Sequence, residues 1–420
     1  MTPEVKERIE QIRHGNVPDG FQETIFGLAP VSWRKNRIDE VCTLSSGSTP
    51  RRDNADNFVG DVLWVTSGEL KKRTIADTIE KISEDAAQKS NLTMYDPGTV
   101  AIAIYGLEAA GIRGTASIVG KRCTISQACM AFTEFNGVDN EFMYYWYLNN
   151  GQIIGLRYAQ GTKQQNLSTD IVGAFPICYP EIREQREIAK ILTTQDKVIE
   201  LKEKLLEEKQ QQKKYLMQQL LTGKKRLPGF DGEWTHVRAN QIFKNVTDKK
   251  HDGTLEVLSA TQDRGIIPRS QVDIDIKYAE ESLTGYKKVV KGNFVISLRS
   301  FQGGIEYSEY TGIVSPAYTV LTSIYPIEDN YYKQFFKSAD YINRLNIAVY
   351  GIRDGKQISY DDFGRIKIPY PPLDEQKAIA TVLATADKEI EILKQTIEQE
   401  KQKKKALMQL LLTGIVRVSV

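Results

Sequence analysis

The sequence has few cysteines, and all four lie in its first half without forming a Cys-x-x-Cys pair: Cys42, Cys123, Cys129 and Cys178. This pattern argues against a disulfide framework and against a cysteine zinc site, and it is typical of reduced thiols in a cytosol. No run of about 18 apolar residues is present. The charged segment Met1–Arg13 contains no apolar core of a signal peptide. We therefore expect a cytoplasmic protein.

Catalytic motifs are also missing. No Gly-Lys pair has the upstream glycine of a phosphate-binding loop, and no Asn-Pro-Pro-aromatic or Asp-Pro-Pro-aromatic tetrapeptide is present to hold an extruded adenine. The segment 273–277, Asp-Ile-Asp-Ile-Lys, contains a nuclease-like D-x-K, but such alternation more often indicates a half-buried strand. The histidines have no spacing that suggests a metal site: His14, His236 and His251. We expect no catalysis, no metal and no cofactor in this chain itself.

An excess of one charge is missing as well. The chain has 56 Lys and Arg against 54 Asp and Glu. Residues 31–180 contain 15 basic and 16 acidic side chains, and residues 231–371 contain 18 of each. If the protein binds nucleic acid, it must do so through local clusters, and a partner must supply much of the phosphate neutralisation.

An internal repeat organises the sequence. Shifted by 191 residues, Glu184–Gly223 aligns with Glu375–Gly414 without a gap and with 21 of 40 positions identical. Both segments follow prolines, carry acidic residues in the first turn and end in glycine, as long helices do. The chain is therefore a duplication that contains two long helices.

Apolar residues recur in both helices at spacings of three and four, which predicts a coiled-coil seam. The middle segments Glu207–Lys214 and Glu398–Lys405 contain no apolar side chain, so one such helix alone would be poorly held. Two antiparallel helices would bury both apolar ends. The predicted seam residues are Ile188, Ile191, Leu192, Val198, Leu201, Leu205, Leu216 and Leu220, and then Ile379, Val382, Leu383, Ile390, Leu393, Ile397, Leu407 and Leu411.

A lobe of domain size precedes each helix. Within the lobes, strands are expected at Val100–Tyr105 and Phe294–Leu298, and helices at Glu141–Leu148 and Tyr331–Leu345. The predicted fold class is α+β: two mixed α/β domains separated by two long helices in an antiparallel coiled coil, with a pseudo-twofold repeat. The predicted parts are an N-terminal helix and lead-in (1–30), a first lobe (31–179), a central helix (180–223), a second lobe (224–371) and a C-terminal helix (372–420).

Several segments resemble the specificity subunits of type I restriction–modification systems. The first lobe opens with Ser46-Gly47-Ser48-Thr49-Pro50 and Trp64-Val65-Thr66-Ser67-Gly68-Glu69-Leu70, and it closes with residues 161–168. The second lobe contains residues 299–304 and 312–318 and closes with residues 355–359. It lacks the Ser-Gly-Ser-Thr-Pro opening, so its first loops cannot be inferred from those of the first lobe. The resemblance extends from about residue 15 to about residue 415.

The resemblance implies that each lobe is a target recognition domain that reads one half of a split site in double-stranded DNA. The paired helices would set the half-site spacing and bind two modification (methyltransferase) subunits. S-adenosylmethionine, ATP and Mg would be bound by partner subunits, which include the ATP-dependent restriction (translocase and nuclease) subunits. The chain itself would bind no membrane.

Arg, Lys, Gln and Asn side chains suit contacts to base edges and phosphates. Those that occur in glycine-containing loops or basic runs are our candidate DNA contacts, although turn formation and solvated charge explain the same patterns. The shared closing pair Leu167-Ser168 and Ile358-Ser359 favours a fold-defining role for that segment. The candidates are Arg51, Arg52, Lys71, Lys72, Lys121, Arg122, Lys163, Gln164, Arg299, Gln302, Arg353 and Lys356. Arg73, which ends the run begun by Lys71 and Lys72, is a further candidate for a phosphate contact.

Two other classes of function remain open at this point. One is a self-sufficient nuclease or methyltransferase, against which the missing motifs argue. The other is a coiled-coil scaffold whose lobes bind protein. The sequence also leaves open the target bases, the spacer length and the existence of restriction subunits.

Overall fold

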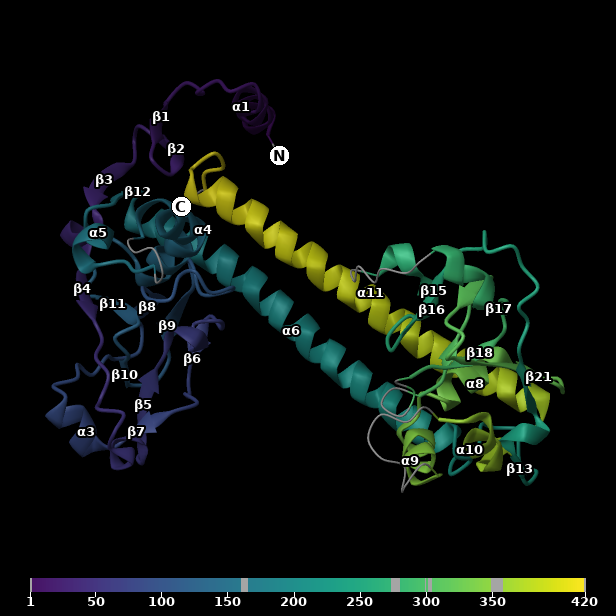
Figure 1. Cartoon of the computed structure of the whole chain (residues 1–420). Helices are drawn as coiled ribbons and strands as arrows, with labels where there is room; N and C mark the ends of the chain where they lie inside the picture. The colour runs from purple at the N-terminus through teal and green to yellow at the C-terminus, as the bar shows by residue number, and fades with distance from the viewer. Residues whose placement is uncertain are drawn as a thin grey trace. The chain divides into compact units, whose positions relative to one another are not determined.

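The computed structural model describes residues 2–159, 165–272, 280–298, 300, 304–348 and 358–418, and Figure 1 shows it coloured along the chain. The chain forms two compact units. The first comprises Met1–Leu201 with Ile397–Val420, and the second comprises Lys202–Thr396. The two long helices, α6 (Ile182–Leu220) and α11 (Leu373–Leu412), each contribute to both units.

A five-stranded sheet in the order β4-β11-β8-β9-β6 forms the centre of the first unit. Pairing is antiparallel except between β6 and β9. Residues of β8 and β9 are buried throughout, which explains their continuous apolar sequences. The strands are β4 (Thr43–Ser46), β11 (Cys129–Thr133), β8 (Val100–Ala103), β9 (Ala116–Val119) and β6 (Thr74–Ile75).

Smaller sheets extend the first unit. Three strands lie in the order β10-β5-β7, and two further pairs are β12 with β3 and β1 with β2. The bounds are β10 (Cys123–Ile125), β5 (Val62–Val65), β7 (Lys81–Ile82), β12 (Pro176–Tyr179), β3 (Arg34–Arg37), β1 (Phe21–Thr24) and β2 (Gly27–Pro30).

Helix α4 (Asn140–Tyr158) is the main helix of the first lobe and confirms the helix predicted at Glu141–Leu148. The Asp139 carboxylate caps it by accepting hydrogen bonds from the backbone N–H groups of Glu141 and Phe142. Residues 142–147 are all buried, so this helix is surrounded by core. Shorter helices are α1 (Pro3–Arg13), α2 (Ile38–Val41), α3 (Glu84–Lys89), α5 (Thr169–Gly173), η1 (Ala55–Phe58) and η2 (Ser67–Glu69).

The second unit contains a four-stranded sheet in the order β14-β21-β18-β19, which repeats the order β4-β11-β8-β9 of the first. Three further pairs are β13 with β22, β15 with β16 and β17 with β20. The bounds are β14 (Phe243–Val246), β21 (Thr319–Ser323), β18 (Phe294–Ile296), β19 (Glu306–Tyr307), β13 (Thr235–Arg238), β22 (Lys367–Tyr370), β15 (Leu258–Thr261), β16 (Gly265–Pro268), β17 (Lys287–Val289) and β20 (Gly312–Val314).

The single helix predicted at Tyr331–Leu345 is wrong, because the segment forms two helices, α8 (Asp329–Phe335) and α9 (Ala339–Ala348). The Ser338 hydroxyl accepts a hydrogen bond from the backbone N–H of Tyr341 and so begins a new helix. Phe336, between the two helices, is fully buried. The remaining helices of the second lobe are α10 (Tyr360–Arg365), η3 (Ala239–Gln241), η4 (Arg269–Gln271) and η5 (Glu280–Gly285).

The long helices contact each other within each unit, and they run antiparallel there. In the first unit, Gln195 Nε2 donates to Glu400 Oε2 at 2.8 Å. In the second unit, Lys209 Nζ lies 2.8 Å from Glu389 Oε2 and Lys213 Nζ lies 2.5 Å from Asp387 Oδ1. Both helices end at glycines with positive φ, +70° at Gly223 and +67° at Gly414, as the repeat predicts.

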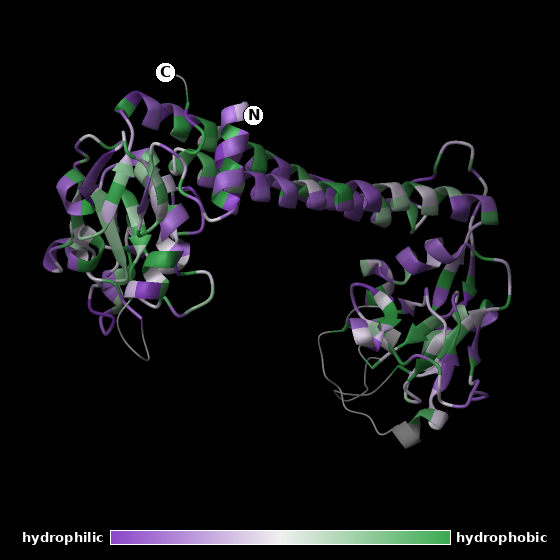
Figure 2. Cartoon of the chain, turned by 90° about the horizontal axis from the view of Figure 1, so that it is seen from above, coloured by the Kyte–Doolittle hydropathy of each residue, from purple (hydrophilic) through white to green (hydrophobic). Residues whose placement is uncertain are grey.

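The predicted seam is wrong at Leu201 and Leu205, whose side chains are 57% and 43% exposed. In this part of α6 the covered side chains are instead Ile199, which is buried, and Leu206, which is half-buried. Several members of this inner set are polar, so the centres of both helices are largely hydrophilic in Figure 2. The inner set of α6 is Leu192, Gln195, Ile199, Lys202, Leu206, Lys209, Lys213, Leu216 and Leu220.

Candidate nucleic-acid interface

Each lobe is closed by the end of one long helix and the beginning of the other. The core of the first lobe includes Ile188 and Leu192 of α6 together with Leu411 and Leu412 of α11. The core of the second lobe includes the equivalent residues in exchanged roles: Ile379 and Leu383 of α11 with Leu220 and Leu221 of α6. Each lobe is therefore held on a platform made of both helices.

Equivalent ion pairs stabilise both helical platforms. Arg417 forms a bidentate pair with Glu184, with both contacts at 2.6 Å. In the second unit Arg226 pairs in the same way with Glu375. The arginines also lie over Trp33 and Trp234, respectively. The arginines and the glutamates correspond through the 191-residue repeat, and the tryptophans occupy equivalent places in their lobes. The two units are therefore closed by equivalent contacts.

Buried glutamines also stabilise the two helical platforms. The Gln185 amide donates to the carbonyls of Gly137 and Pro180, and its oxygen accepts from the N–H of Asp139. Gln376 makes the corresponding bonds to Pro371 and Glu328. Because both amides are fully buried and each both donates and accepts hydrogen bonds, the Glu-Gln pair that opens each helix repeat is a structural element.

The segments that carry the family resemblance in the first lobe shape its loops. A Cβ on Gly47 would lie 2.1 Å from the carbonyl oxygen of Ile125, so only glycine fits there. The Glu69 carboxylate accepts hydrogen bonds from the N–H groups of Thr66 and Ile79. Gly47 and Glu69 of these motifs therefore define loop structure.

Arg51 and Arg52 are exposed at the loop that follows Pro50. The Arg52 guanidinium forms a bidentate pair with Glu80, at 2.6 and 2.8 Å, and lies 4.3 Å from the ring centroid of Phe58. This pairing raises the pKa of Arg52 and lowers that of Glu80. The guanidinium is thus held in one orientation, with donors left over for a phosphate or a base.

The other two basic pairs of the first lobe do not lie together. Lys71 and Lys72 are exposed just before β6, and Lys121 and Arg122 are exposed just after β9. Because β6 and β9 are parallel, the two pairs lie at opposite ends of these strands. They form two separate patches. Arg122 Nε is also 3.6 Å from Asp96 Oδ1.

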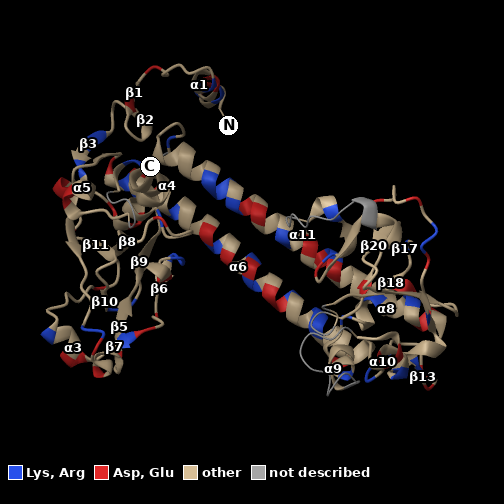
Figure 3. Ribbon diagram, in the orientation of Figure 1, with Lys and Arg blue, Asp and Glu red and all other residues tan. Residues whose placement is uncertain are grey.

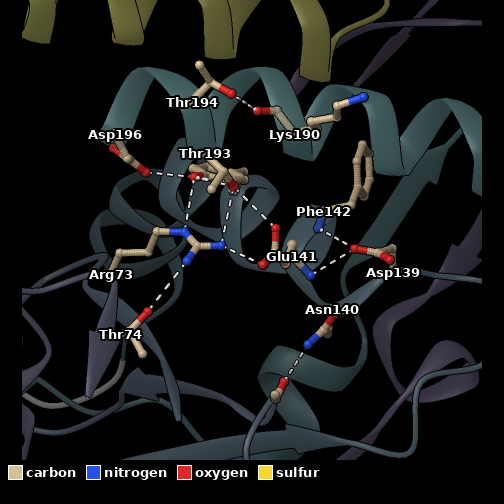
Figure 4. Close-up of polar contacts among 12 residues, drawn as sticks. Arg73, Thr74, Asp139, Asn140, Glu141, Phe142, Lys190, Thr193, Thr194 and Asp196 are labelled. Atoms are coloured by element: carbon tan, nitrogen blue, oxygen red, sulfur yellow. Dashed lines mark hydrogen bonds and ion pairs between the residues drawn. The ribbon is translucent and has the colours of Figure 1, made fainter. Parts of the chain in front are cut away.

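Arg73, which follows Lys72, turns away from solvent toward the long helices (Figure 4). Its Nη2 donates to Glu141 Oε1 at 2.6 Å and to Thr193 Oγ1 at 3.3 Å. Its Nε donates to the Tyr145 hydroxyl at 3.3 Å. Tyr145 in turn donates to Asp196 Oδ2 at 2.6 Å. The sequence predicts Arg73 as a phosphate contact together with Lys71 and Lys72, but its guanidinium is bound within the protein. Only the structure brings the segment before β6 together with α4 and α6.

Six of the predicted DNA contacts lie outside the described residues: Lys163, Gln164, Arg299, Gln302, Arg353 and Lys356. The closing pairs next to two of these segments are described. Leu167 and Ile358 are buried, and the Ser168 and Ser359 hydroxyls cap helices α5 and α10. This fold-defining role agrees with the expectation drawn from their recurrence in both lobes.

The second lobe contains a lysine cluster that the sequence analysis did not single out. Lys249, Lys250, Lys287 and Lys288 come together because the N–H of Lys288 donates to the carbonyl of Asp248. Burial and the neighbouring Lys249 ammonium lower the pKa of Lys287. None of these four lysines is ion-paired within the described part of the chain. Two Lys-Lys dipeptides were the signal in the sequence, but their 37-residue separation concealed the proximity.

Charges of both signs are interspersed elsewhere on both lobes and along the helices (Figure 3). Among the residues described by the structure, no group of three His, Cys, Asp or Glu side chains could hold a metal ion. Burial raises the pKa of Cys42, Cys123 and Cys129 to about 12, so these thiols stay protonated at neutral pH. No helix within the described ranges combines the length and apolarity that a membrane span needs.

The fold is thus a duplicated one, in which two lobes of the same strand order are each closed by two long helices. The family model described as "Type I restriction modification DNA specificity domain" matches residues 30–211 and again residues 232–402. The chain belongs to this family.

Relatives in Methanocaldococcus jannaschii are similar to this chain. The type I restriction enzyme MjaVIII specificity subunit is 26% identical over 95% of this chain and 96% of its own length. The MjaIX specificity subunit is 26% identical over 44% of this chain and 42% of its own length. A protein provisionally named the MjaX specificity subunit is 27% identical over 62% of this chain. The chain thus spans 63% and 42% of the MjaX and MjaIX subunits, respectively, and almost the whole MjaVIII subunit.

Solved structures share the fold. The S subunit of a type I restriction–modification system from M. genitalium aligns with a TM-score of 0.52 and 14% identity over 92% of this chain and 97% of its own. A chain from a study of complex assembly and conformational transition in the type I system aligns with a TM-score of 0.59 and 18% identity. It covers 92% of this chain and 99% of its own.

Proposed function

We propose that this chain is the non-catalytic DNA sequence-recognition subunit of a type I restriction–modification complex. The observation that supports this most directly is the duplication of the lobe, because the family model matches each copy separately and both copies have the same strand order. Two DNA-binding lobes of similar fold are suited to a DNA site that is split into two halves. Each lobe then reads one half-site.

The helices form the connecting part of this proposal. We infer an antiparallel coiled coil with pseudo-twofold symmetry, supported by the exchanged ion pairs Arg226–Glu375 and Arg417–Glu184. The five-part division of the chain at 30, 179, 223 and 371 follows from it. At about 1.5 Å per residue, the 39 residues of α6 extend roughly 58 Å. In this proposal the length of the helices sets the spacing between the half-sites.

Partner subunits supply the chemistry in this proposal. The family resemblance assigns S-adenosylmethionine and adenine methylation to two modification subunits bound at the helices. It assigns ATP, Mg, translocation and cleavage to restriction subunits. The complex acts on double-stranded DNA, and its place is the cytoplasm. The alternative of a protein-binding scaffold is disfavoured, because the family match covers both lobes as well as the helices.

Phosphate contacts in the first lobe are assigned to Arg51, Lys71, Lys72, Lys121 and Arg122, and those in the second lobe to the lysine cluster. Arg52 is a candidate for base or phosphate contact, because Glu80 holds its guanidinium rigidly. We retain Lys163, Gln164, Arg299, Gln302, Arg353 and Lys356 as candidates. Near-neutral lobes with local basic patches predict weak binding by the chain alone and strong binding in the complex.

A lobe exchange tests the proposed function. Residues 31–178 are replaced by the first lobe of another family member, and the chain is expressed with its modification partner. Long-read methylome sequencing should show one half-site changed and the other retained. A change in both half-sites, or in neither, contradicts the proposal. So does methylation or cleavage by the purified chain alone.

A further inference from the structure

The first lobe is attached to the helices at two points. The first is its apolar platform, where Ile188, Ala189 and Leu192 of α6 belong to the core of the lobe. The second begins just beyond this platform on α6, at Thr193 and Asp196, where the contacts are polar (Figure 4). A lobe that is held only at its platform can tilt relative to the helices, whereas a second attachment further along the helix restrains the tilt.

Arg73 makes the second attachment. It lies in the segment that leads into edge strand β6, and its side chain joins Glu141 and Tyr145 of α4 to Thr193 of α6. The Arg73 side chain is 25% exposed and the Glu141 side chain is 39% exposed. A charge-assisted bond in this partly desolvated setting is stronger than an ordinary surface ion pair.

The attachment also includes α11 in the first unit. Tyr145 donates to Asp196, and Lys404 Nζ lies 2.5 Å from the other oxygen of the same carboxylate. The Lys404 ammonium is also 5.6 Å from the centroid of the Tyr145 ring. Arg73 is therefore connected through Tyr145 and Asp196 to both helices.

The second unit retains only part of this arrangement. Asp387 is equivalent to Asp196, and it is bound by Lys213 and by Gln334 of α8. At the position of Thr193, however, the repeat has Ala384. Asn330, two residues after the capping Glu328, stands where Glu141 follows Asp139, and its amide bonds back to Glu328. In the part of the second unit that the structure describes, these two positions offer a guanidinium neither a carboxylate nor a hydroxyl.

We propose that Arg73 is a positioning residue that braces the first lobe against the two long helices and thereby narrows the range of half-site spacings that the protein accepts. The proposal rests on the proposed function, in which two half-sites are read at a fixed separation. Lys71 and Lys72 precede Arg73 directly, and the Arg73 carbonyl accepts a hydrogen bond from Ile118 in β9. A phosphate contact by these lysines would therefore be made by a segment whose orientation the brace fixes.

The test measures discrimination between spacers. The full chain is assembled with its modification subunits. Methylation is then measured by competition among duplexes that share both half-sites and differ by one base pair more or less in the spacer. Arg73→Ala should lower the preference for the normal spacer by about tenfold, the equivalent of one charge-assisted hydrogen bond. Discrimination against a single wrong base within either half-site should stay at the wild-type value, which a general loss of folding would not allow.

Milder variants protect the test from loss of folding. Thr193→Ala removes one uncharged contact, and Glu141→Gln weakens another while keeping an acceptor; each should relax spacer discrimination less than Arg73→Ala does. Lys190→Ala is the matched control, because Lys190 is exposed on the same helix and pairs only with Glu187 of that helix. It should behave as wild type.

The outcomes separate the two proposals. If the wild type prefers one spacer and Arg73→Ala retains that preference unchanged, the brace is wrong and the recognition function stands. If the wild type recognises no bipartite site at all, the recognition function fails, and the brace fails with it. Loss of spacer discrimination together with loss of base discrimination would show a structural role only, and would also overturn the brace.

Discussion

The Arg226 guanidinium closes on the fully buried carboxylate of Glu375, with its Nε 2.5 Å from Oε1 and its Nη2 2.6 Å from Oε2. Trp234 Nε1 adds a third bond to this carboxylate at 2.8 Å. The equivalent pair Arg417–Glu184 is more open, since the Arg417 side chain is 45% exposed and that of Arg226 is 21% exposed. The indole N–H of Trp33, the counterpart of Trp234, has no hydrogen-bond partner among the residues that the structure describes.

Arg226→Ala should lower the free energy of unfolding of the second unit by about 3 kcal/mol, because it leaves a buried carboxylate without its cation. Arg417→Ala should lower that of the first unit by only about 1–2 kcal/mol, because water partly screens the half-exposed Arg417 side chain, although Glu184 itself is buried. Urea denaturation of both variants measures the difference. An equal or smaller loss for Arg226→Ala would contradict the assignment of the tighter pair.

Glu306 predicts a pH dependence of the second lobe. Burial raises its pKa above the ordinary value of 4.5, although Lys337 contacts it, and its Oε2 has no hydrogen-bond partner within the described part of the chain. A raised pKa in the folded state means that ionisation of Glu306 costs stability. This stability is fully present below the pKa of the unfolded chain and is lost as the pH rises through that of the folded chain.

Glu306→Gln should therefore gain stability relative to the wild type as the pH rises above 4.5, and the difference should be constant below it. Urea denaturation at a series of pH values measures this difference. Glu309→Gln, which changes a half-exposed carboxylate of the same lobe, is the matched control. A difference for Glu306→Gln that does not change with pH would show that the carboxylate is not destabilising.

The lysine cluster should act on DNA of any sequence. In the complex, the double variant Lys249→Ala with Lys250→Ala should weaken binding to matched and mismatched duplexes by the same factor. The slope of log affinity against log salt should become shallower by about 0.9 for each lost phosphate contact. Binding isotherms at several salt concentrations provide the measurement. Lys333→Ala, which removes a lysine that Glu309 already neutralises, should leave the slope nearly unchanged.

A different result is expected for Arg299 and Gln302, which belong to the candidate base contacts. Alanine at either position should relax discrimination at one base pair by about 1–3 kcal/mol if the contact is direct. Competition binding with singly substituted half-sites separates the two kinds of contact. Uniform weakening across all sequences would assign the residue to the phosphate backbone.

Helix length should determine the spacer. Seven residues inserted after Gln211 and after Gln402 preserve the three-four spacing of the inner positions. They should lengthen the spacer by about three base pairs, from ~10 Å of added helix at ~3.4 Å per base pair. Methylome sequencing should then show the original half-sites further apart. The same insertion in one helix only is the control and should disrupt helix pairing. Methylation at the original spacing by the folded double insertion would make the helix a passive tether.

The sequence predicted those parts of the fold that depend on local pattern. Continuous apolar runs identified β8 and β18, and the gapless repeat identified α6 and α11. The phase of the helix contact was missed, because Leu201 and Leu205 are as apolar as Ile199 and Leu206 and also fit a three-four pattern. Only the partner helix decides which of these two pairs is covered.

Contacts across long distances in the chain could not be predicted in the same way. The lysine cluster depends on a backbone bond between Lys288 and Asp248, and the Arg73 network depends on an edge strand lying against α4 and α6. No periodicity records such contacts. The basic residues found from sequence were those in runs or glycine-containing loops, so the run 71–73 was identified as a whole. Its pattern could not show that the Arg73 side chain binds α4 and α6 while Lys71 and Lys72 are exposed.

The exchanged closure of the lobes also sets an order of events during synthesis. Leu220 and Leu221, which complete the second lobe, are made before it, so that lobe can finish folding as soon as it and the start of α11 have left the ribosome. The first lobe needs Met408, Leu411 and Leu412, which are made after the whole of the second lobe. The first lobe is therefore made before the second lobe but completed after it, and a chain truncated before Leu407 would expose the core of the lobe that lies farther from the missing segment in sequence.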